Sequence, residues 1–591
     1  MNLPIEISEK ARYWSEASIF DSHTRKEIAS LIEEENSSEL MDRFYKDLNF
    51  GTGGMRGIMG AGTCRMNVYN IRKATTALGL YLKEIEKSKQ ITVAISFDSR
   101  NNSQSFAERA AEVLVAMDIQ VIITQEMRPV PMLSFMVRKY QCHAGICITA
   151  SHNPPAYNGF KVYWSTGGQL TPPHDQNIIS YYENIRNYEE LKFLPYHQGI
   201  EQKLIKKIGP ELDNAYFAEL NNLKLNPKEQ SPLRIVYSPI HGTGIYAVPK
   251  ALNLFGFSDV HIPQEQEQPA GNFPTVKSPN PEDQEALVQA LDLAKKVNGD
   301  LVLATDPDSD RIACMIKEEN EYRKFDGNQL CCLLTEYILS SLKRNNRVPK
   351  SPLIVTTIVT SDLHKKIAAH YEIPCEETLT GFKWICQLIE DYECGIRKPY
   401  RQFICGGEES YGFLTGNFVR DKDAISSCAV AAEMVSYYKK IGFSLSDVLD
   451  SIYKRHGFHA DSLFNLVLPG HEGSLRINRI MEKFRKQTPH SFCGIKIEKV
   501  RDLKNLNLQK VQNGSWQCEK ISHLPPSNVL QFFLEDGSKI SLRPSGTEPK
   551  IKIYSSIVDS SGSISIDVKK KTTEKLRQVE AEIRSMIEVI S

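Results

Sequence analysis

The chain contains the run Ala144-Gly145-Ile146-Cys147-Ile148, which leads directly into Thr149-Ala150-Ser151-His152-Asn153-Pro154. Five small and apolar residues in an unbroken row indicate a strand that is buried on both faces, as in a parallel sheet. Proline at positions 154 and 155 then forces a turn. Ser151 is therefore predicted at the carboxyl end of a strand in an open α/β sheet, which is where such sheets bind ligands.

Alternating strands and helices continue on both sides of this run. The sequence predicts strands at 91–95, 121–123 and 160–164, with a helix between the first two. Such alternation is typical of βαβ units and of a mostly parallel sheet. Residues 1–50 are polar and helical in character, which predicts a solvated arm. The glycine-rich stretch 51–57 predicts a tight turn, because it lacks the endings of phosphate-binding and dinucleotide-binding loops.

The pattern restarts twice and then changes. A second unit is expected from strands at 233–237 and 301–304, and a third from a helix around 330–334 with strands at 353–355 and 403–405. Beyond residue 462, strands at 539–542 and 550–554 and a final amphipathic helix indicate a smaller α+β domain. We therefore predict four domains, with the boundaries 1–214, 215–325, 326–461 and 462–591.

Composition excludes several classes of function. A chain of 591 residues is too long for one core. Its 72 basic and 72 acidic residues leave no net charge, so no overall field draws it to nucleic acid or to an anionic membrane. We find no signal peptide and no apolar run of membrane length, and the 13 cysteines lack the spacing of a metal site or a disulfide framework. We expect a cytoplasmic protein with no nucleic-acid or membrane partner.

A second loop with chemical potential follows the strand expected at 301–304. Asp306, Asp308 and Asp310 place carboxylates at alternate positions, and such hard oxygen ligands suit Mg²⁺ or Ca²⁺. An EF-hand is excluded, because Arg311 and Lys317 stand where that loop needs glycine and glutamate. Mg²⁺ usually keeps a water or phosphate oxygen among its ligands, which leaves room for an oxygen on Ser151. By itself the loop is also compatible with an acidic, solvated turn.

Two further loops can bind a polar ligand. Arg543-Pro544-Ser545-Gly546-Thr547 combines a guanidinium, two hydroxyl donors and a glycine that lets backbone N–H groups approach an anion, and this composition indicates a phosphate clamp. Glu408 and Ser410 can accept from and donate to neighbouring sugar hydroxyls. Taken singly, each of these loops, and the Ser151 loop too, is compatible with an ordinary turn.

The four loops together indicate one kind of reaction. A nucleophilic hydroxyl, a set of metal-binding carboxylates, a carboxylate for hydroxyls and a phosphate clamp come from four successive units, each after a strand. This combination is that of phosphoryl transfer on a phosphosugar. Two alternatives are a metal-dependent phosphosugar phosphatase, in which Ser151 passes its phosphate to water, and a phosphosugar sensor without catalysis.

The same loops resemble the signature motifs of the α-D-phosphohexomutases, the phosphoglucomutase and phosphomannomutase family. The matching stretches are 149–154, 306–311, 407–410 and 543–549, and they follow the family's order over nearly the whole chain. Gly-Glu-Glu-Ser-Tyr at 407–411, Thr-Leu-Thr-Gly-Phe-Lys-Trp at 378–384 and the long N-terminal arm look most like the larger phosphoglucomutase and phosphopentomutase branch.

This resemblance implies a fold and a set of roles. It implies an α/β protein with three α/β domains of mixed, mostly parallel sheets and a smaller α+β C-terminal domain, arranged around a central active-site cleft. It also implies that Ser151 carries the phosphate, and that Mg²⁺ is held by Ser151 with Asp306, Asp308 and Asp310. The catalytic residues around the phosphoserine would be Arg56, His152 and Lys161, with Lys161 a candidate for proton transfer. The implied substrate-binding residues are Arg311, Thr380, Gly381, Glu408, Ser410, Lys422, Arg543, Ser545, Gly546 and Thr547. The family often has glycine where Ala424 stands here.

The expected reaction is the interconversion of α-D-glucose 1-phosphate and glucose 6-phosphate by an intramolecular phosphotransferase, an isomerase of carbohydrate metabolism. Phospho-Ser151 gives its phosphoryl group to the sugar, and the resulting sugar 1,6-bisphosphate, which also serves as activator, turns around and returns its other phosphate. Phosphomannomutase and phosphopentomutase activities are the alternatives, because pocket contacts of about 1–3 kcal/mol decide among such sugars. We expect a monomer or a homodimer.

Overall fold

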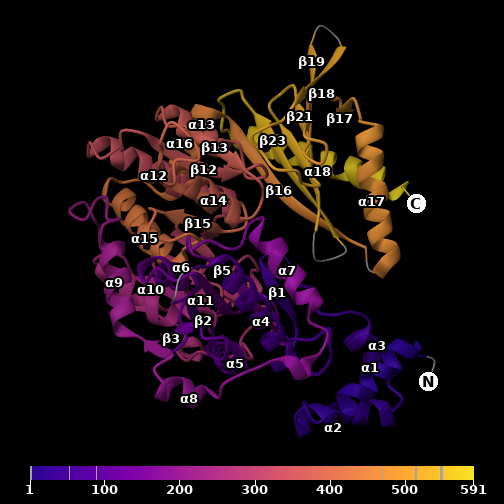
Figure 1. Ribbon diagram of the computed structural model, residues 1–591. Helices are drawn as coiled ribbons and strands as arrows, with labels where there is room; N and C mark the ends of the chain where they lie inside the picture. Colours follow the sequence, from indigo (N-terminus) through magenta and orange to yellow (C-terminus); the bar gives the residue numbers. More distant parts are fainter. Residues whose placement is uncertain are drawn as a thin grey trace. The chain divides into compact units, whose positions relative to one another are not determined.

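The computed structural model describes residues 3–51, 53–87, 90–468, 470–512, 515–545 and 550–590 (Figure 1). It divides into two compact units. Unit 1 comprises Met1–Asp326, Cys386–Cys405 and Ser410–Lys440, and unit 2 comprises Gly327–Ile385, Gly406–Glu409 and Ile441–Ser591. Three sheets accompanied by helices and a fourth, largely antiparallel sheet near the C-terminus confirm the predicted α/β fold class.

The first sheet belongs to unit 1 and has the strand order β1-β5-β4-β2-β3-β6. β4, β2, β3 and β6 pair in parallel, whereas β5 and β1 are added antiparallel at one edge. The strands are β1 Gly54–Ile58, β2 Thr92–Phe97, β3 Gln120–Thr124, β4 Ala144–Ile148, β5 Tyr157–Trp164 and β6 Ile205–Ile208. The helices of this region are α4 Val68–Ile85, α5 Ser103–Ala116, α6 Val130–Lys139, α7 His174–Asn184, α8 Tyr196–Glu201 and α9 Pro210–Asn221.

The strand predicted at 144–148 is β4, and all of its residues are buried. β4 lies between β5 and β2, and its apolar side chains join the core that also contains side chains of α4 and α5. Burial on both faces explains why its sequence shows no alternation of polar and apolar residues. The carboxyl ends of β4 and β2 therefore lie side by side at one edge of the sheet.

Two expectations for the N-terminal region are wrong in detail. Part of the glycine-rich stretch is the edge strand β1, because a Cβ at Gly54, whose φ is 122°, would collide with the carbonyl of Phe160 in the neighbouring β5. The expected solvated arm is the helices α1 Ile5–Glu16, α2 Ser22–Glu33 and α3 Ser37–Phe44, which have a core of their own. Trp14 and Phe20 stack in that core with ring centroids 4.3 Å apart.

The second sheet also belongs to unit 1 and has the order β11-β10-β9-β7-β8. β9 pairs in parallel with β7 and antiparallel with β10, so the sheet is mixed. The strands are β7 Ile235–Ser238, β8 Val260–His261, β9 Leu301–Thr305, β10 Ile312–Glu318 and β11 Glu321–Lys324, with the helices α10 Gly244–Leu254 and α11 Val288–Val297. The strand predicted at 301–304 is the fully buried β9, which leads into the aspartate loop.

The third sheet has the order β13-β12-β14-β15, with β12 and β13 parallel. Its strands are β12 Pro352–Thr357, β13 Cys375–Thr378, β14 Gln402–Glu408 and β15 Gly412–Thr415. The helices of this part of the chain are α12 Gly327–Arg344, α13 Leu363–His370, α14 Phe382–Glu393, α15 Ala424–Lys440 and α16 Leu445–His456. The helix predicted around 330–334 is the first part of α12.

The fourth sheet lies in unit 2 and has the order β16-β23-β22-β21-β18-β19-β20, with β17 paired to β18. Its described pairs are antiparallel, as expected for a domain of α+β type. The long helix α18 packs on the β16–β23 side of this sheet (Figure 1). The strands are β16 Phe458–Val467, β17 Ser491–Phe492, β18 Ile495–Asp502, β19 Asn507–Gln512, β20 Ser515–Lys520, β21 Leu530–Leu534, β22 Lys539–Pro544 and β23 Lys550–Asp559, and the helices are α17 Gly470–Lys486 and α18 Ile566–Glu588. The four predicted domain boundaries stay a prediction.

Candidate active site

Ser151 lies three residues beyond the end of β4, and only 3% of its surface is exposed. Its backbone has a φ of 51°, in the left-handed region that residues with side chains seldom adopt. Its N–H donates to Thr149 Oγ1 over 2.9 Å, and its own Oγ donates to Asp306 Oδ2 over 2.7 Å. The turn after β4 therefore holds the hydroxyl beside the aspartate loop.

The aspartate loop follows β9, and Asp306, Asp308 and Asp310 offer oxygens that all lie within 4.8 Å of one another. All of these aspartates are buried, at 3% exposure or less. The backbone N–H groups of Asp310 and Arg311 donate to Asp306 Oδ1 over 3.1 Å and 3.0 Å. The turn at residues 307–309 thus brings the carboxylates together in one place.

Two lysines of unit 1 face the aspartates. Lys161 Nζ, on β5, lies 2.7 Å from Asp308 Oδ2 and 3.5 Å from Asp310 Oδ2. Lys422 Nζ lies 3.1 Å from Asp310 Oδ2 and 3.0 Å from Asp421 Oδ1. Burial alone lowers the pKa of Lys161, but the charges of Asp308 and Asp310 outweigh it and raise that pKa above its ordinary value. Lys161 is therefore a cation at neutral pH.

The carboxyl groups of the loop titrate in opposite directions. Burial, followed by the charges of Asp308 and Asp310, raises the pKa of Asp306 well above its ordinary value. Burial also disfavours the charged form of Asp310, but Lys422, Lys161 and Arg311 overcome this effect and lower its pKa. A cation bound beside Asp306 would oppose the effects of burial and of the neighbouring carboxylates on that group.

The residues present fit a divalent metal ion. Asp308 Oδ1 and Asp310 Oδ1 are buried and have no hydrogen-bond partner among the described residues. Buried oxygens without a partner cost free energy unless a ligand satisfies them. Carboxylate and hydroxyl oxygens are the donors that Mg²⁺ prefers over nitrogen or sulfur. In the part of the chain that the structure describes, this is the one cluster of its kind.

The other predicted catalytic residues, His152 and Arg56, differ in their contacts and in their exposure to solvent. His152 Nδ1 is 3.1 Å from Ser151 Oγ, and burial, with Arg311 and Arg56 nearby, lowers the pKa of His152 well below its ordinary value. Its imidazole is therefore neutral at pH 7. Arg56, on β1, is exposed and donates to Asn153 Oδ1 over 2.8 Å. Arg311 pairs with Glu282.

The residues of the predicted sugar loop belong to both units. In unit 2, Glu408 at the end of β14 is 5% exposed, and its Oε1 accepts from the N–H of Gly381 over 2.8 Å. Gly381 has a φ of 114°, a conformation that favours glycine. Thr380 Oγ1 is buried without a hydrogen-bond partner among the described residues. Ser410 belongs to unit 1, in the turn between β14 and β15.

The predicted phosphate clamp is described only in part. Arg543 and Ser545 lie at the end of β22, and the N–H of Ser545 donates to the carbonyl of Lys550 at the start of β23 over 2.8 Å. Arg543 is opposite Lys552 in the β22–β23 ladder, so two cations stand side by side. Gly546 and Thr547 lie outside the described residues.

Glu409 of unit 2 was not singled out from the sequence. Burial and the neighbouring carboxylate of Glu408 raise its pKa to about 7, against the charges of Lys552 and Arg543, which lower it. Its Oε2 accepts from Thr360 Oγ1 over 3.3 Å. Glu409 thus lies within electrostatic reach of both the sugar loop and the clamp arginine.

Glu409→Gln is expected to raise the free energy of unfolding at pH 8 by roughly 3 kcal/mol and to leave it nearly unchanged at pH 4.5. Between pH 4.5 and about 7 the folded state keeps a proton on Glu409 that the unfolded state has released, so wild-type stability falls as pH rises through this window. Melting temperatures across that range test the expectation. The exposed Glu498→Gln in the same unit serves as control, and equal pH profiles for wild type and Glu409→Gln would contradict the prediction.

Several contacts of the site could not be found from the sequence. Tyr163 donates to Asp421 Oδ2 over 2.6 Å, and Gln169 Nε2 donates to the same oxygen over 3.0 Å, so Asp421 orients the lysine next to it. Ala424 is the buried first residue of α15, and its N–H donates to the carbonyl of Ser309 over 3.2 Å. The alanine therefore fits a helix start at the aspartate loop.

Comparison with known proteins accounts for this arrangement. Family models described as phosphoglucomutase/phosphomannomutase alpha/beta/alpha domains I, II and III match residues 47–189, 214–319 and 326–456. The chain belongs to the phosphoglucomutase/phosphomannomutase family. This result confirms the resemblance inferred from the loop motifs, and with it the predicted enzyme class, an isomerase that transfers phosphoryl groups within a sugar phosphate.

Relatives cover nearly the whole chain. A phosphoglucomutase of Staphylococcus haemolyticus is 35% identical over 547 residues, which is 92% of this chain and 96% of that protein. A phosphoglucomutase of Staphylococcus epidermidis is 34% identical over 531 residues, or 90% of this chain and 94% of that protein.

Solved structures of the phosphoglucomutase/phosphomannomutase family share the fold. A putative phosphomannomutase from Thermus thermophilus has a TM-score of 0.65 at 20% identity, covering 92% of this chain and 99% of that chain. Parafusin, a phosphoglucomutase from Paramecium, has a TM-score of 0.63 at 18% identity, covering 92% and 95%. Among the described residues of this family member, no helix has both the length and the apolar character needed to span a membrane.

Proposed function

We propose that this enzyme interconverts α-D-glucose 1-phosphate and glucose 6-phosphate through a phosphorylated Ser151 and glucose 1,6-bisphosphate. The observation that carries the proposal is the buried Ser151 hydroxyl, 2.7 Å from Asp306 in a cluster of aspartates with unpartnered oxygens. The choice of glucose is supported by relatives that cover nine tenths of the chain and are named phosphoglucomutase.

The proposed chemistry uses Ser151 twice. In the first transfer the P–O bond to Ser151 Oγ breaks, a P–O bond to a sugar hydroxyl oxygen forms, the sugar hydroxyl loses its proton and Ser151 Oγ gains one. In the second, the P–O bond at the other end of the bisphosphate breaks, Ser151 Oγ loses its proton and forms the new P–O bond, and the sugar oxygen gains a proton. Because Lys161 is a cation, we assign to it the donation of a proton to the oxygen that leaves phosphorus and the return uptake of the proton from the attacking oxygen. The neutral His152 has its Nδ1 3.1 Å from Ser151 Oγ.

We propose that Mg²⁺ is held by Asp306, Asp308 and Asp310 together with the phosphorylated Ser151. A phosphoserine brings roughly −1.5 to −2 charges beside these carboxylates. Each contact between like charges at 4 Å costs about 4 kcal/mol at an effective dielectric of 20. When bound, the ion would neutralise this charge and the charge that develops on the transferring phosphoryl group. Lys161 forms an ion pair with Asp308, and Lys422 forms one with Asp310, so the two lysines hold these carboxylates in place.

In this proposal the remaining predicted residues bind different groups of the sugar phosphate. Glu408, held by Gly381, would accept from sugar hydroxyls, and Thr380 and Ser410 would bind hydroxyls beside it. Arg543 with Ser545, Gly546 and Thr547 would bind the phosphate that is not reacting, in either orientation of the sugar. The residues proposed to flank the reacting phosphate are Arg56, Arg311 and Lys422. Cytoplasmic location and a monomer or homodimer stay predictions. The cysteines of the described residues are not in disulfides, which agrees with a reducing compartment.

One assay tests the proposal against its alternatives. The purified enzyme with Mg²⁺ and catalytic glucose 1,6-bisphosphate is offered glucose 1-phosphate, mannose 1-phosphate or ribose 1-phosphate, and the products are separated. We expect fastest conversion of glucose 1-phosphate to the 6-phosphate. Faster conversion of the mannose or pentose compound would reassign the substrate. Release of free phosphate without isomerisation would instead indicate a phosphosugar phosphatase.

A further inference from the structure

The loop that carries Ser151 needs support beyond the residues of the proposed chemistry. Ser151 keeps a left-handed φ of 51° although it has a side chain. Such a conformation persists where the surrounding structure holds it in place, and it concentrates at functional sites. The loop between β4 and β5 also exposes backbone carbonyls to the protein interior, and these need donors.

Arg100, two residues after Asp98 at the end of β2, binds these carbonyls. Its side chain has no exposed surface. Nη1 donates to the carbonyl of Pro154 over 2.9 Å and to that of Tyr157 over 3.0 Å, and Nη2 donates to the carbonyl of Ser151 over 2.6 Å. Nη2 also donates to the carbonyl of Asn153. One guanidinium thus binds four carbonyls of one loop, including that of the nucleophile.

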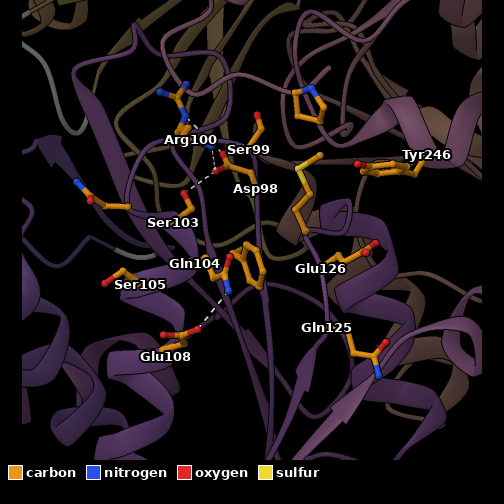
Figure 2. Close-up of a pocket in the computed structure, with 14 residues that line it drawn as sticks. Asp98, Ser99, Arg100, Ser103, Gln104, Ser105, Glu108, Gln125, Glu126 and Tyr246 are labelled. Carbon is orange, nitrogen blue, oxygen red and sulfur yellow. Dashed lines mark hydrogen bonds and ion pairs between the residues drawn. The ribbon is translucent and has the colours of Figure 1, made fainter. Parts of the chain in front are cut away.

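Arg100 is held in place from its other side. Its Nε lies 3.4 Å from Asp98 Oδ2, and Asp98 Oδ1 accepts from the Arg100 N–H over 2.9 Å and from Ser103 Oγ over 2.6 Å. Figure 2 shows Asp98, Arg100 and Ser103 among the residues that line a pocket. The ring centroid of Phe273 lies 4.9 Å from the guanidinium carbon. These contacts fix the orientation of the Arg100 guanidinium independently of its hydrogen bonds to the loop.

We propose that Arg100 is a positioning residue for phosphoryl transfer, which holds the loop 151–157 so that Ser151 Oγ stays aligned with the Asp306 carboxylate. Lysine cannot replace it, because an ammonium group is a point charge, whereas the planar guanidinium presents several donors in a rigid fork. The inference rests on the proposed role of Ser151 as nucleophile. A displacement of about 1 Å at a reacting group can cost on the order of 100-fold in rate.

The decisive variant is Arg100→Lys, which keeps a positive charge beside Asp98. Arg100→Ala would leave Asp98 buried without its counter-ion and can unfold the domain. We expect Arg100→Lys to lower kcat by about 100-fold with KM for the sugar phosphate nearly unchanged. The matched control is Arg43→Lys, because Arg43 donates to the carbonyl of Ala61 and pairs with Glu39 among the N-terminal helices. This control is expected to lose stability but to keep kcat.

A second measurement does not depend on activity. Hydrogen exchange of the N–H groups in residues 150–157 is expected to quicken in Arg100→Lys and to stay unchanged in Arg43→Lys. If wild type neither isomerises sugar phosphates nor becomes phosphorylated on Ser151, the proposed function fails, and the exchange data still decide the positioning of the loop. The inference is overturned if wild type is active and Arg100→Lys has the kcat of wild type and the same hydrogen exchange in the loop. It is also overturned if the only change in Arg100→Lys is a lower melting temperature.

Discussion

Ser151→Ala is expected to abolish sugar phosphate isomerisation, lowering kcat by a factor on the order of 10⁶, while the protein stays folded. The variant removes the one oxygen that would form the bond to phosphorus, and no other described hydroxyl donates to Asp306 in its place. Alanine fits the site because it only deletes Oγ, and the hydrogen bonds of the backbone remain. A coupled assay measures kcat, and intact mass spectrometry measures phosphate uptake from glucose 1,6-bisphosphate.

The control for this variant is Ser105→Ala, an exposed serine in the first turn of α5 of the same unit. It is expected to keep both turnover and phosphate uptake. Normal turnover in Ser151→Ala would show that another residue carries the phosphate. Uptake of one phosphate per chain by this variant, which lacks Oγ, would show the same. Loss of the melting transition in Ser151→Ala would instead assign the hydroxyl a structural role.

Removal of divalent metal is expected to lower kcat by about 10³-fold or more, equivalent to about 4 kcal/mol, with recovery on addition of Mg²⁺. Burial raises the pKa of Asp306, and the neighbouring charges of Asp308 and Asp310 raise it further, so a cation bound there would be stabilised by these carboxylates. Mg²⁺ at 100 times its dissociation constant should therefore also stabilise the fold by about 2.7 kcal/mol. Activity after chelation and the melting temperature with and without Mg²⁺ measure the two effects.

Asp308→Asn tests whether the aspartate cluster is the site of both effects. It removes one charge and one carboxylate oxygen, so we expect the Mg²⁺-dependent rise in melting temperature to disappear together with activity. Asp118→Asn is the control, because the Asp118 side chain is 93% exposed and asparagine tolerates its φ of 56°. An equal response to Mg²⁺ in Asp308→Asn and wild type would place the metal elsewhere.

Strands whose burial is two-sided could be predicted from the sequence because the pattern is local. β4 and β9 are unbroken apolar runs, and both end in the loops that the sequence marked as chemically important. β1 could not be predicted in this way. Its glycines favour a turn by propensity, and it becomes a strand because Gly54 lets its backbone approach Phe160 of β5.

The candidate site likewise contains residues that the sequence could predict and residues that it could not. Aspartates at positions 306, 308 and 310 lie within five residues of the sequence. Because the loop is this short, their carboxylates are close together in space as well. The lysines that face them are distant, at positions 161 and 422, and neither position has a local pattern that points to the cluster. Arg100 is likewise separated from its loop by about fifty residues, and its role follows only from the parallel pairing of β2 and β4.

For this protein the sequence by itself determined the strands that are buried on both faces, the family, and the residue types of the four loops, because each of these rests on local patterns and short motifs. Only the tertiary structure decided which charges meet. Lys161 reaches the aspartates from the antiparallel strand β5, and Lys422 reaches them from the segment before α15. Arg100 reaches four carbonyls of the Ser151 loop because β2 and β4 pair in parallel and end at the same edge of the sheet. The pKa values of Asp306 and Asp310 diverge for the same reason, since burial and charge depend on neighbours in space.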